Sequence, residues 1–313
     1  MDQKNKTIKL SIVIPMFNES ENIKPLVEEI KKCLPVDIDY EFILVDDGSR
    51  DETFTIASKL AQKDNKIRAL SFYRNFGHQA ALTAGLSEAK GDIILTMDSD
   101  FQHPPDQISA MINKWREGFD LVVAQKENDP TKNIFIKFIR YIGYKSYSII
   151  GDKIIPGVSD FRLMDRNILD YVLRCNEVNA VLRGLVMIPA KKIYIHPYKV
   201  HERRAGKSGY TISKLFNLFL YTVTSFSLKP LRLASILGFA LVLLSFVYLL
   251  FILFAKFILE WQIIEGWTAL IFCVLLLFGF NFLYLGILSE YIGIIFWEVK
   301  RRPKYIVHKR VNI

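Results

Sequence analysis

The segment Asp92–Pro105 reads DIILTMDSDFQHPP and joins a short apolar run to a cluster of polar side chains. The run Ile93–Met97 carries no charge and has the length of a strand, which is typical of a strand buried in a sheet. Two carboxylates, Asp98 and Asp100, follow it with one residue between them. Because side chains alternate along an extended chain, both can point to one hard cation, with Gln102 as a third oxygen ligand. A metal-free turn is the alternative interpretation.

On both sides of this segment the chain alternates between short apolar runs and amphipathic stretches of helical length. Repetition of strand, helix and strand predicts an α/β fold with a mostly parallel sheet, in which ligands bind at the carboxyl ends of the strands. The expected strands are Leu10–Ile14, Glu41–Val45, Ile67–Phe72, Asp92–Met97 and Asp120–Ala124, and the expected helices are roughly Glu21–Cys33, Asp51–Gln62, His78–Ala89 and Pro105–Trp115.

Polar side chains also follow the first two expected strands. The first strand leads into Pro15 and Glu19, and the second leads into Asp46, Asp47 and Gly48. Paired acids at a strand end can accept hydrogen bonds from a nucleoside base or ribose, and a glycine permits the turn. A turn followed by an ordinary helix cap would show the same residue types, so this cluster alone leaves both interpretations open.

Several common sites are absent from the sequence. No GxGxxG occurs, which argues against a dinucleotide-binding domain. Gly206, Lys207 and Ser208 resemble the end of a phosphate-binding loop, but His201 stands where that motif requires its first glycine. The three cysteines match neither a disulfide framework nor a CxxC metal site, and they fit a reducing compartment.

The C-terminal third of the chain contains two long uncharged runs. Residues 233–255 and 266–289 each exceed the roughly 20 residues that span a bilayer core, so we expect two transmembrane helices within 231–298. A pair of buried core helices is the alternative. Basic residues dominate after the second run, so the segment 299–313 is expected to be a basic cytoplasmic tail. Two spans then return the N-terminal domain to the cytoplasmic face of the plasma membrane.

Two amphipathic segments are candidates for the membrane surface. Residues 211–230 place apolar side chains at helical spacing and predict an interfacial helix. Residues 134–150 predict a second one, although an ordinary core helix fits that segment equally well. The N-terminal domain therefore comprises residues 1–210 and includes the segment 134–150.

The remaining composition adds three expectations. Residues 1–230 hold 33 of the 41 basic residues and 28 of the 32 acidic ones, a balance that does not call for a nucleic-acid partner. His78 and His103 lie near acids but are predicted to be hydrogen-bonding or packing residues and not metal ligands. Gly279, Gly286 and Gly293 recur at heptad spacing, which would suit either a homo-oligomer or close packing of the two spans.

Six motifs in a fixed order resemble the family 2 glycosyltransferases that act on polyprenyl phosphates, a group that includes bactoprenol glucosyltransferases and dolichol-phosphate mannose synthases. Together they extend from residue 12 to residue 210. The motifs are IVIPMFNE (Ile12–Glu19), VDDGSRDET (Val45–Thr53), RNFGHQAAL (Arg74–Leu82), DSDFQHPP (Asp98–Pro105), SDFRLMDR (Ser159–Arg166) and RRAGKSGY (Arg203–Tyr210).

The resemblance implies a GT-A fold, a nucleotide-sugar donor, Mg²⁺ or Mn²⁺ as cofactor, and inversion at the anomeric carbon. It also implies roles for matching residues. The nucleotide sugar would contact Pro15, Glu19, Asp46, Asp47, Asp98 and Lys126, the metal would contact Asp98, Asp100 and Gln102, the catalytic group would comprise Asp160, Arg203 and Ser208, and the acceptor phosphate would contact Arg203, Arg204 and Lys207. At Lys126 the family often has arginine, and lysine loses the bidentate geometry.

The chemistry of the acceptor limits what Asp160 has to do. A lipid phosphate is already anionic near neutral pH, so it needs little deprotonation before it attacks the sugar. We therefore expect Asp160 to orient the acceptor or Arg162 more than to remove a proton. A simple ion pair of Asp160 with Arg162 or Arg166 is the alternative.

The expected reaction is inverting transfer of glucose from UDP-glucose to undecaprenyl phosphate on the cytoplasmic face of the membrane. GDP-mannose and UDP-N-acetylhexosamines remain open as donors, because no motif reports the shape of the donor pocket. A processive polysaccharide synthase is disfavoured by the absence of QxxRW. The alternative that is not an enzyme is a membrane scaffold protein that keeps the glycosyltransferase fold without activity. Since two spans do not easily carry a glycosylated lipid across, a separate flippase is expected to follow.

Overall fold

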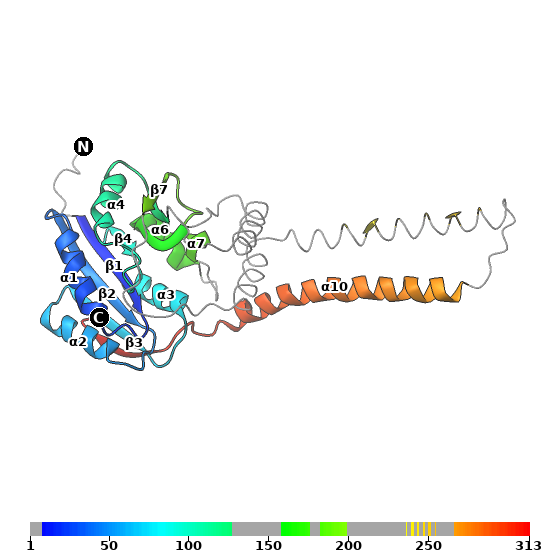
Figure 1. Cartoon of the computed structure of the whole chain (residues 1–313), viewed down its shortest axis with the longest axis horizontal. Helices are drawn as coiled ribbons and strands as arrows, with labels where there is room; N and C mark the ends of the chain where they lie inside the picture. Colours follow the sequence, from blue (N-terminus) through cyan, green and yellow to red (C-terminus); the bar gives the residue numbers. More distant parts are fainter. Residues whose placement is uncertain are drawn as a thin grey trace. The chain divides into compact units, whose positions relative to one another are not determined.

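The computed structural model describes residues 8–126, 158–175, 182–198 and 266–313, with isolated residues between 236 and 254 (Figure 1). The chain divides into two compact units. The first contains Met1–Ser148, Asp152–Gly209 and Arg302–Ile313, and the second contains Ile149–Gly151 and Tyr210–Arg301. The C-terminal residues therefore belong to the same unit as the N-terminal domain.

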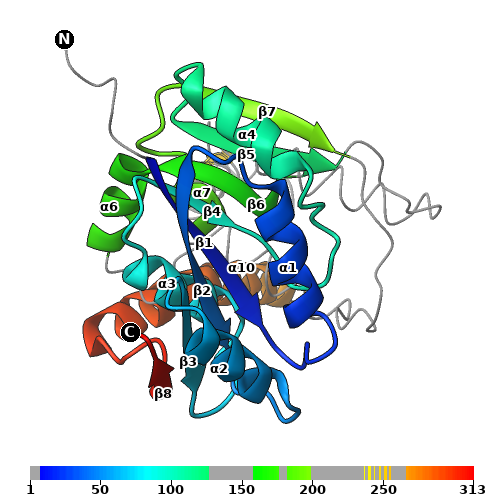
Figure 2. The same ribbon diagram turned by 90° about the vertical axis from the view of Figure 1, so that its left-hand side faces the viewer.

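The first unit is built on one sheet of eight strands in the order β7-β5-β6-β4-β1-β2-β3-β8 (Figure 2). Neighbours among β1 to β4 are parallel, β5 is parallel to β7, and β6 and β8 are antiparallel to the strands that they pair with, so the sheet is mixed. The strands are β1 (Ile8–Met16), β2 (Ile38–Asp46), β3 (Ile67–Phe72), β4 (Ile93–Thr96), β5 (Leu121–Lys126), β6 (Val158–Asp165), β7 (Ile193–Tyr198) and β8 (Val307–Val311).

Helices cover both faces of the sheet and create two hydrophobic cores. One core includes Ile23 of α1, Ala57 of α2 and Ile108 of α4, while the other includes Leu82 of α3 and Ile168 of α6. Because both faces are covered, β4 is buried along its whole length, as its uncharged run predicted. The helices are α1 (Ile23–Cys33), α2 (Thr53–Lys63), α3 (His78–Glu88), α4 (Gln107–Arg116), α6 (Arg166–Arg174) and α7 (Leu182–Leu185).

The alternation of strands and helices expected up to residue 126 is confirmed, with boundaries that differ by a few residues. Three strands were not expected. β6 and β7 lie in the part of the chain where the sequence pattern is less regular, and β8 lies in the segment 299–313 that we expected to be a tail. That expectation is corrected here, because β8 pairs with β3 in the sheet.

Packing explains why so polar a segment forms a strand. A register shift opposite Ser71 and Phe72 leaves His308 as an extra residue in β8. Such a bulge reverses the alternation of side chains. Val307 accordingly packs against the core under α3, whereas Val311 packs against the core under α2.

The second unit contains α10 (Trp267–Lys300), which includes the expected second span. Its part Leu276–Lys300 is 25 residues long, apolar and unburied, and it is the one helix within the described residues that is long and apolar enough to cross a membrane. Of the first expected span, 233–255, only isolated residues are described, and these are helical. Two transmembrane helices are therefore not confirmed. The expected interfacial helices at 134–150 and 211–230 lie outside the described residues.

Candidate active site

The antiparallel pairing of β4 with β6 brings two acidic motifs together. Thr96 is the partner of Arg162 in the register, and the Thr96 hydroxyl donates a hydrogen bond of 2.6 Å to the carbonyl oxygen of Asp160. Continuing this register by two residues on each strand places Asp98 opposite Asp160. The two carboxylates, 62 residues apart in sequence, thus meet at the edge of the sheet where β1 to β4 end.

Asp160 is a buried carboxylate held by two arginines. Its side chain is 3% exposed and accepts hydrogen bonds from Arg162 of the same strand and from Arg183 of α7. The guanidinium of Arg183 bonds both carboxylate oxygens, with Nη2 at 2.6 Å and Nε at 3.2 Å. Burial alone would raise the pKa of Asp160, but the charge of Arg162 and the bonds from His78 and Arg183 hold it well below the ordinary value. Asp160 is therefore an anion at neutral pH.

His78 stands between the two acidic motifs. It is the first residue of α3, and its Nε2 atom lies 3.5 Å from Asp98 Oδ1 and 3.5 Å from Asp160 Oδ2. Although burial lowers the pKa of His78, the two carboxylates raise it above the ordinary value. The imidazole is 43% exposed, so it faces the same open edge as Asp98.

The Asp98 turn presents several oxygen atoms to the position expected for a divalent cation. Asp98 Oδ1 is a buried oxygen without a hydrogen-bond partner, which is the kind of atom that a cation would satisfy. Asp100 Oδ1 accepts the backbone N–H of Gln102 at 3.1 Å, and Phe101 has φ of +63°, so the turn is tightly bent. No group of three or more His, Cys, Asp or Glu side chains gathers for a metal within the described ranges. The two carboxylates and the Gln102 amide fit a hard cation that keeps waters or substrate oxygens as its other ligands.

His103 has a structural role in this turn. Its Nδ1 atom accepts the backbone N–H of Asp98 at 2.9 Å, and its ring stacks on Phe161 with centroids 5.1 Å apart. Burial lowers the pKa of His103. A neutral ring with these contacts agrees with the predicted packing role.

The acids after β2 organise the neighbouring loop. Asp46 accepts hydrogen bonds from the Ser49 N–H and the Ser71 hydroxyl. Asp47 accepts the backbone N–H groups of Phe76 at 2.6 Å and Gly77 at 2.9 Å, and burial raises its pKa. These bonds fix the loop between β3 and α3. The expected nucleoside contacts of Asp46 and Asp47 stay a prediction.

The other expected site residues are only partly described. Pro15 is buried in β1 beside Val45 of β2, and Glu19 accepts a hydrogen bond of 2.6 Å from Asn22. Lys126 is the exposed last residue of β5. The four residues expected to handle phosphate lie outside the described residues. They are Arg203, Arg204, Lys207 and Ser208.

Arg183 was not among the candidate site residues, although the sequence carries a signal for it. It is the single charged residue in the run Val181–Met187. A charge in an apolar run is rarely buried without a partner, so it predicts an ion pair. What the sequence could not reveal is that the partner is Asp160.

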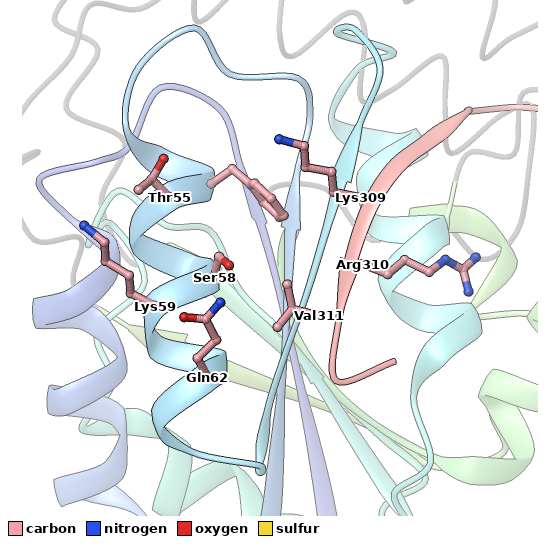
Figure 3. Close-up of a pocket in the computed structure, with 8 residues that line it drawn as sticks. Thr55, Ser58, Lys59, Gln62, Lys309, Arg310 and Val311 are labelled. Atoms are coloured by element: carbon pink, nitrogen blue, oxygen red, sulfur yellow. The ribbon is translucent and has the colours of Figure 1, made fainter.

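A separate hollow of about 530 Å³ lies between α2 and β8 (Figure 3). Its rim is basic and polar and includes Ser58, Lys59 and Lys309, while the guanidinium of Arg310 points away from it (Figure 3). None of the candidate site residues lines this hollow.

Comparison with known proteins connects this geometry to a family. The family model described as "Glycosyl transferase family 2" matches residues 11–173. The chain is 37% identical over 311 residues to the uncharacterized glycosyltransferase YkcC of Bacillus subtilis, covering 99% of this chain and 96% of that one. It is 35% identical over 306 residues to the SfII prophage-derived bactoprenol glucosyl transferase of Shigella flexneri, covering 96% and 98%.

A solved structure has the same fold. Glucosyl-3-phosphoglycerate synthase from Mycobacterium tuberculosis, in complex with Mn²⁺, UDP and phosphoglyceric acid, superimposes with a TM-score of 0.50 at 19% identity. The match covers 69% of this chain and 76% of that one. At this identity the likeness concerns the fold.

Proposed function

The chain belongs to glycosyl transferase family 2, and from this premise we propose that it transfers a sugar from a nucleotide-sugar donor to a polyprenyl phosphate. Relatives named bactoprenol glucosyl transferase, similar over nearly the full chain, support this acceptor class. Our preferred donor is UDP-glucose and our preferred acceptor is undecaprenyl phosphate, which gives a polyprenyl-monophosphate sugar.

The main support for the proposal is the position of His78 at the open edge of the sheet, within 3.5 Å of both Asp98 and Asp160. In the proposed reaction an oxygen of the acceptor phosphate attacks the anomeric carbon of the donor sugar. The bond from that carbon to the donor diphosphate breaks with inversion, and the nucleoside diphosphate leaves with the bonding electron pair. A site for this reaction must accommodate the diphosphate of the donor and the phosphate of the acceptor.

Asp98, Asp100 and Gln102 are the residues that would hold a divalent cation. Such a cation, when bound, neutralises the charge that develops on the departing diphosphate. The backbone N–H of Gln102 donates a hydrogen bond to Asp100 Oδ1, which orients the Asp100 carboxylate.

Asp160 positions Arg183 and does not act as a base in this proposal. Its pKa lies well below the ordinary value, so it is a poor proton acceptor at neutral pH. Its carboxylate fixes one side of the Arg183 guanidinium, and 51% of the arginine side chain is exposed. A guanidinium held in this way suits a phosphate oxygen, because no further ordering is needed when the phosphate arrives.

We further propose that the protein is a multi-pass protein of the bacterial inner membrane with its catalytic domain on the cytoplasmic side. The apolar helix Leu276–Lys300 and the basic residues that follow it support this orientation. Reaction at that face would leave the sugar-lipid on the cytoplasmic side, so a flippase is expected as the next activity. A mannose synthase that uses GDP-mannose and a scaffold without activity are alternatives for the assay to separate.

The test uses the full-length protein purified in detergent. It is incubated with undecaprenyl phosphate and a panel of UDP- and GDP-sugars, with Mg²⁺, Mn²⁺ or EDTA, and the lipid is analysed by mass spectrometry. We expect a lipid monophosphate hexose that forms only with a divalent cation, and the donor that supports it identifies the sugar. Donor binding without any glycolipid, in the presence of an active control enzyme, would contradict the proposal and favour the scaffold.

A further inference from the structure

The C-terminal strand contacts the part of the sheet that leads into the candidate active site. β8 pairs antiparallel with β3, and the backbone N–H of Tyr73 donates a hydrogen bond of 3.0 Å to the carbonyl oxygen of Ile306. Tyr73 begins the segment Tyr73–Gly77, named here the donor loop, which connects β3 to α3. The strand that follows the apolar helix α10 in sequence therefore borders this loop.

Aromatic side chains connect β8 to the donor loop. Tyr305 stacks on Phe72 with ring centroids 4.9 Å apart and an angle of 12° between the rings. The same Phe72 meets Phe76 edge to face, with centroids 5.8 Å apart. Phe72 is 2% exposed, so Tyr305 closes one side of a buried aromatic cluster whose other end is in the donor loop.

The donor loop in turn holds site residues. Its Phe76 and Gly77 N–H groups bind Asp47, and a Cβ atom added at Gly48 would lie 2.4 Å from the carbonyl carbon of Arg74. Immediately after the loop, His78 lies 3.5 Å from both Asp98 and Asp160. A displacement of Phe76 is therefore expected to weaken the Asp47 contacts.

We propose that Tyr305 is a positioning residue: the segment that returns from the membrane helix braces the donor loop, and with it the nucleotide-sugar site. The inference rests on the proposed function only where donor binding is the readout. An aromatic stack of this kind corresponds to about a 10-fold change in an equilibrium constant. The segment that follows α10 in sequence would then contact the loop that holds Asp47.

The experiment compares three variants of the full-length protein in detergent. Tyr305→Ala removes the stack, and Tyr305→Phe keeps the ring while removing the hydroxyl that lies 3.4 Å from the Ser87 hydroxyl. Asn312→Ala is the matched control, because Asn312 ties the other end of β8 to the carbonyls of Ala61 and Ile67. That end lies beside the amino end of β3, away from the donor loop.

Two readouts are measured. The first is amide hydrogen exchange of residues 74–78, which needs no substrate, and the second is KM for the nucleotide sugar with kcat measured in parallel. For Tyr305→Ala we expect exchange and donor KM to rise by about 10-fold with kcat within about twofold of the wild-type value. In Tyr305→Phe, amide exchange and donor KM should return to their wild-type values. Asn312→Ala should lower Tm and leave amide exchange and donor KM unchanged.

If amide exchange of residues 74–78 is unchanged in Tyr305→Ala, the proposal is wrong. It is also wrong if exchange rises equally in Asn312→Ala, because the effect would then be general destabilisation. If the wild-type protein uses no nucleotide sugar, the proposed function fails. The exchange readout still decides for or against the brace in that case.

Discussion

Glu41 and Asp160 are both buried carboxylates that bind arginine in the same sheet, but their surroundings differ. Glu41 lies in the first half of β2 and accepts hydrogen bonds of 2.7 Å from the Ser11 hydroxyl and the Lys90 backbone N–H. Its charge is balanced by Lys9 at 3.1 Å and Arg68 at 3.7 Å, and the side chain of Arg68 is only 7% exposed. This network is closed to solvent on most sides.

The network around Asp160 is open. Arg183 and His78, which both contact Asp160, are about half exposed. Two nitrogens of Arg162 and one oxygen of Asp98 are buried without a hydrogen-bond partner, whereas no such atom occurs in the Glu41 network among the described residues. A closed network of charges stabilises the fold, while an open one with unsatisfied atoms is arranged for a ligand. The first is expected to affect stability and the second to affect turnover.

The largest effect is expected for Asp98→Asn, which keeps the shape of the side chain and removes its charge. Turnover of the nucleotide sugar should fall by about 10²- to 10³-fold, the cost of losing one electrostatic contact to the reacting groups. Steady-state rates at saturating Mn²⁺ provide the measurement, with Glu41→Gln as the matched control that should stay within about twofold. Equal losses in the two variants would remove the distinction between the networks.

Arg183→Lys tests whether the open network presents a bidentate group. Lysine keeps the positive charge beside Asp160 but loses the planar geometry, so turnover should fall by about 10- to 100-fold with little change in Tm. The control is Arg116→Lys, because Arg116 forms a surface ion pair with Asp37. Full activity of Arg183→Lys would show that only charge is needed at this position.

Glu41→Gln is expected to show the opposite pattern. Loss of the charge weakens the bonds to Ser11, Lys9 and Arg68, and the free energy of unfolding should fall by about 2 kcal/mol. Denaturant titration followed by fluorescence measures this loss, and donor KM should stay unchanged. A Glu41→Gln protein with normal stability would contradict the structural role given to the closed network.

The smallest expected effect is the change with pH in the contribution of Glu41 to the free energy of unfolding. Burial alone would raise the pKa of Glu41, but the bonds from Ser11, Lys90 and Lys9 outweigh it and hold the pKa below the ordinary value of 4.5. Its stabilising contribution is therefore complete above pH 4.5 and is lost as the pH falls through the lower pKa of the folded protein. The difference in unfolding free energy between wild-type protein and Glu41→Gln should shrink in that acidic range. A difference that stays constant down to pH 3 would argue against this assignment.

Local sequence patterns were sufficient for much of the fold. The strands and helices up to residue 126 follow from short apolar runs and amphipathic stretches, because burial on both faces of a sheet favours mostly apolar strands. The same patterns could not identify β8. Its five residues VHKRV are mostly polar, and only pairing with β3 and a bulge at His308 make them a strand.

The candidate site, like the fold, could be predicted only in part from local sequence patterns. The order and chemistry of the motifs, including the two acids at Asp98 and Asp100, could be predicted from the sequence, because residue types limit what a loop can bind. The position of His78, 3.5 Å from both Asp98 and Asp160, could not be predicted, nor could the ion pair of Asp160 with Arg183. Those depend on the direction and register of β6, which hydrogen bonds between distant parts of the chain decide.

By itself, the sequence determined which segments are buried, which carry charge at strand ends, and that the C-terminal third contains long apolar runs. Only the tertiary structure decided that Asp160 is a buried carboxylate paired with Arg183, and that the last residues of the chain join the sheet beside the donor loop. The physical reason is that periodicity reports the environment of each residue, whereas partners distant in sequence are selected by strand pairing and packing of the whole domain.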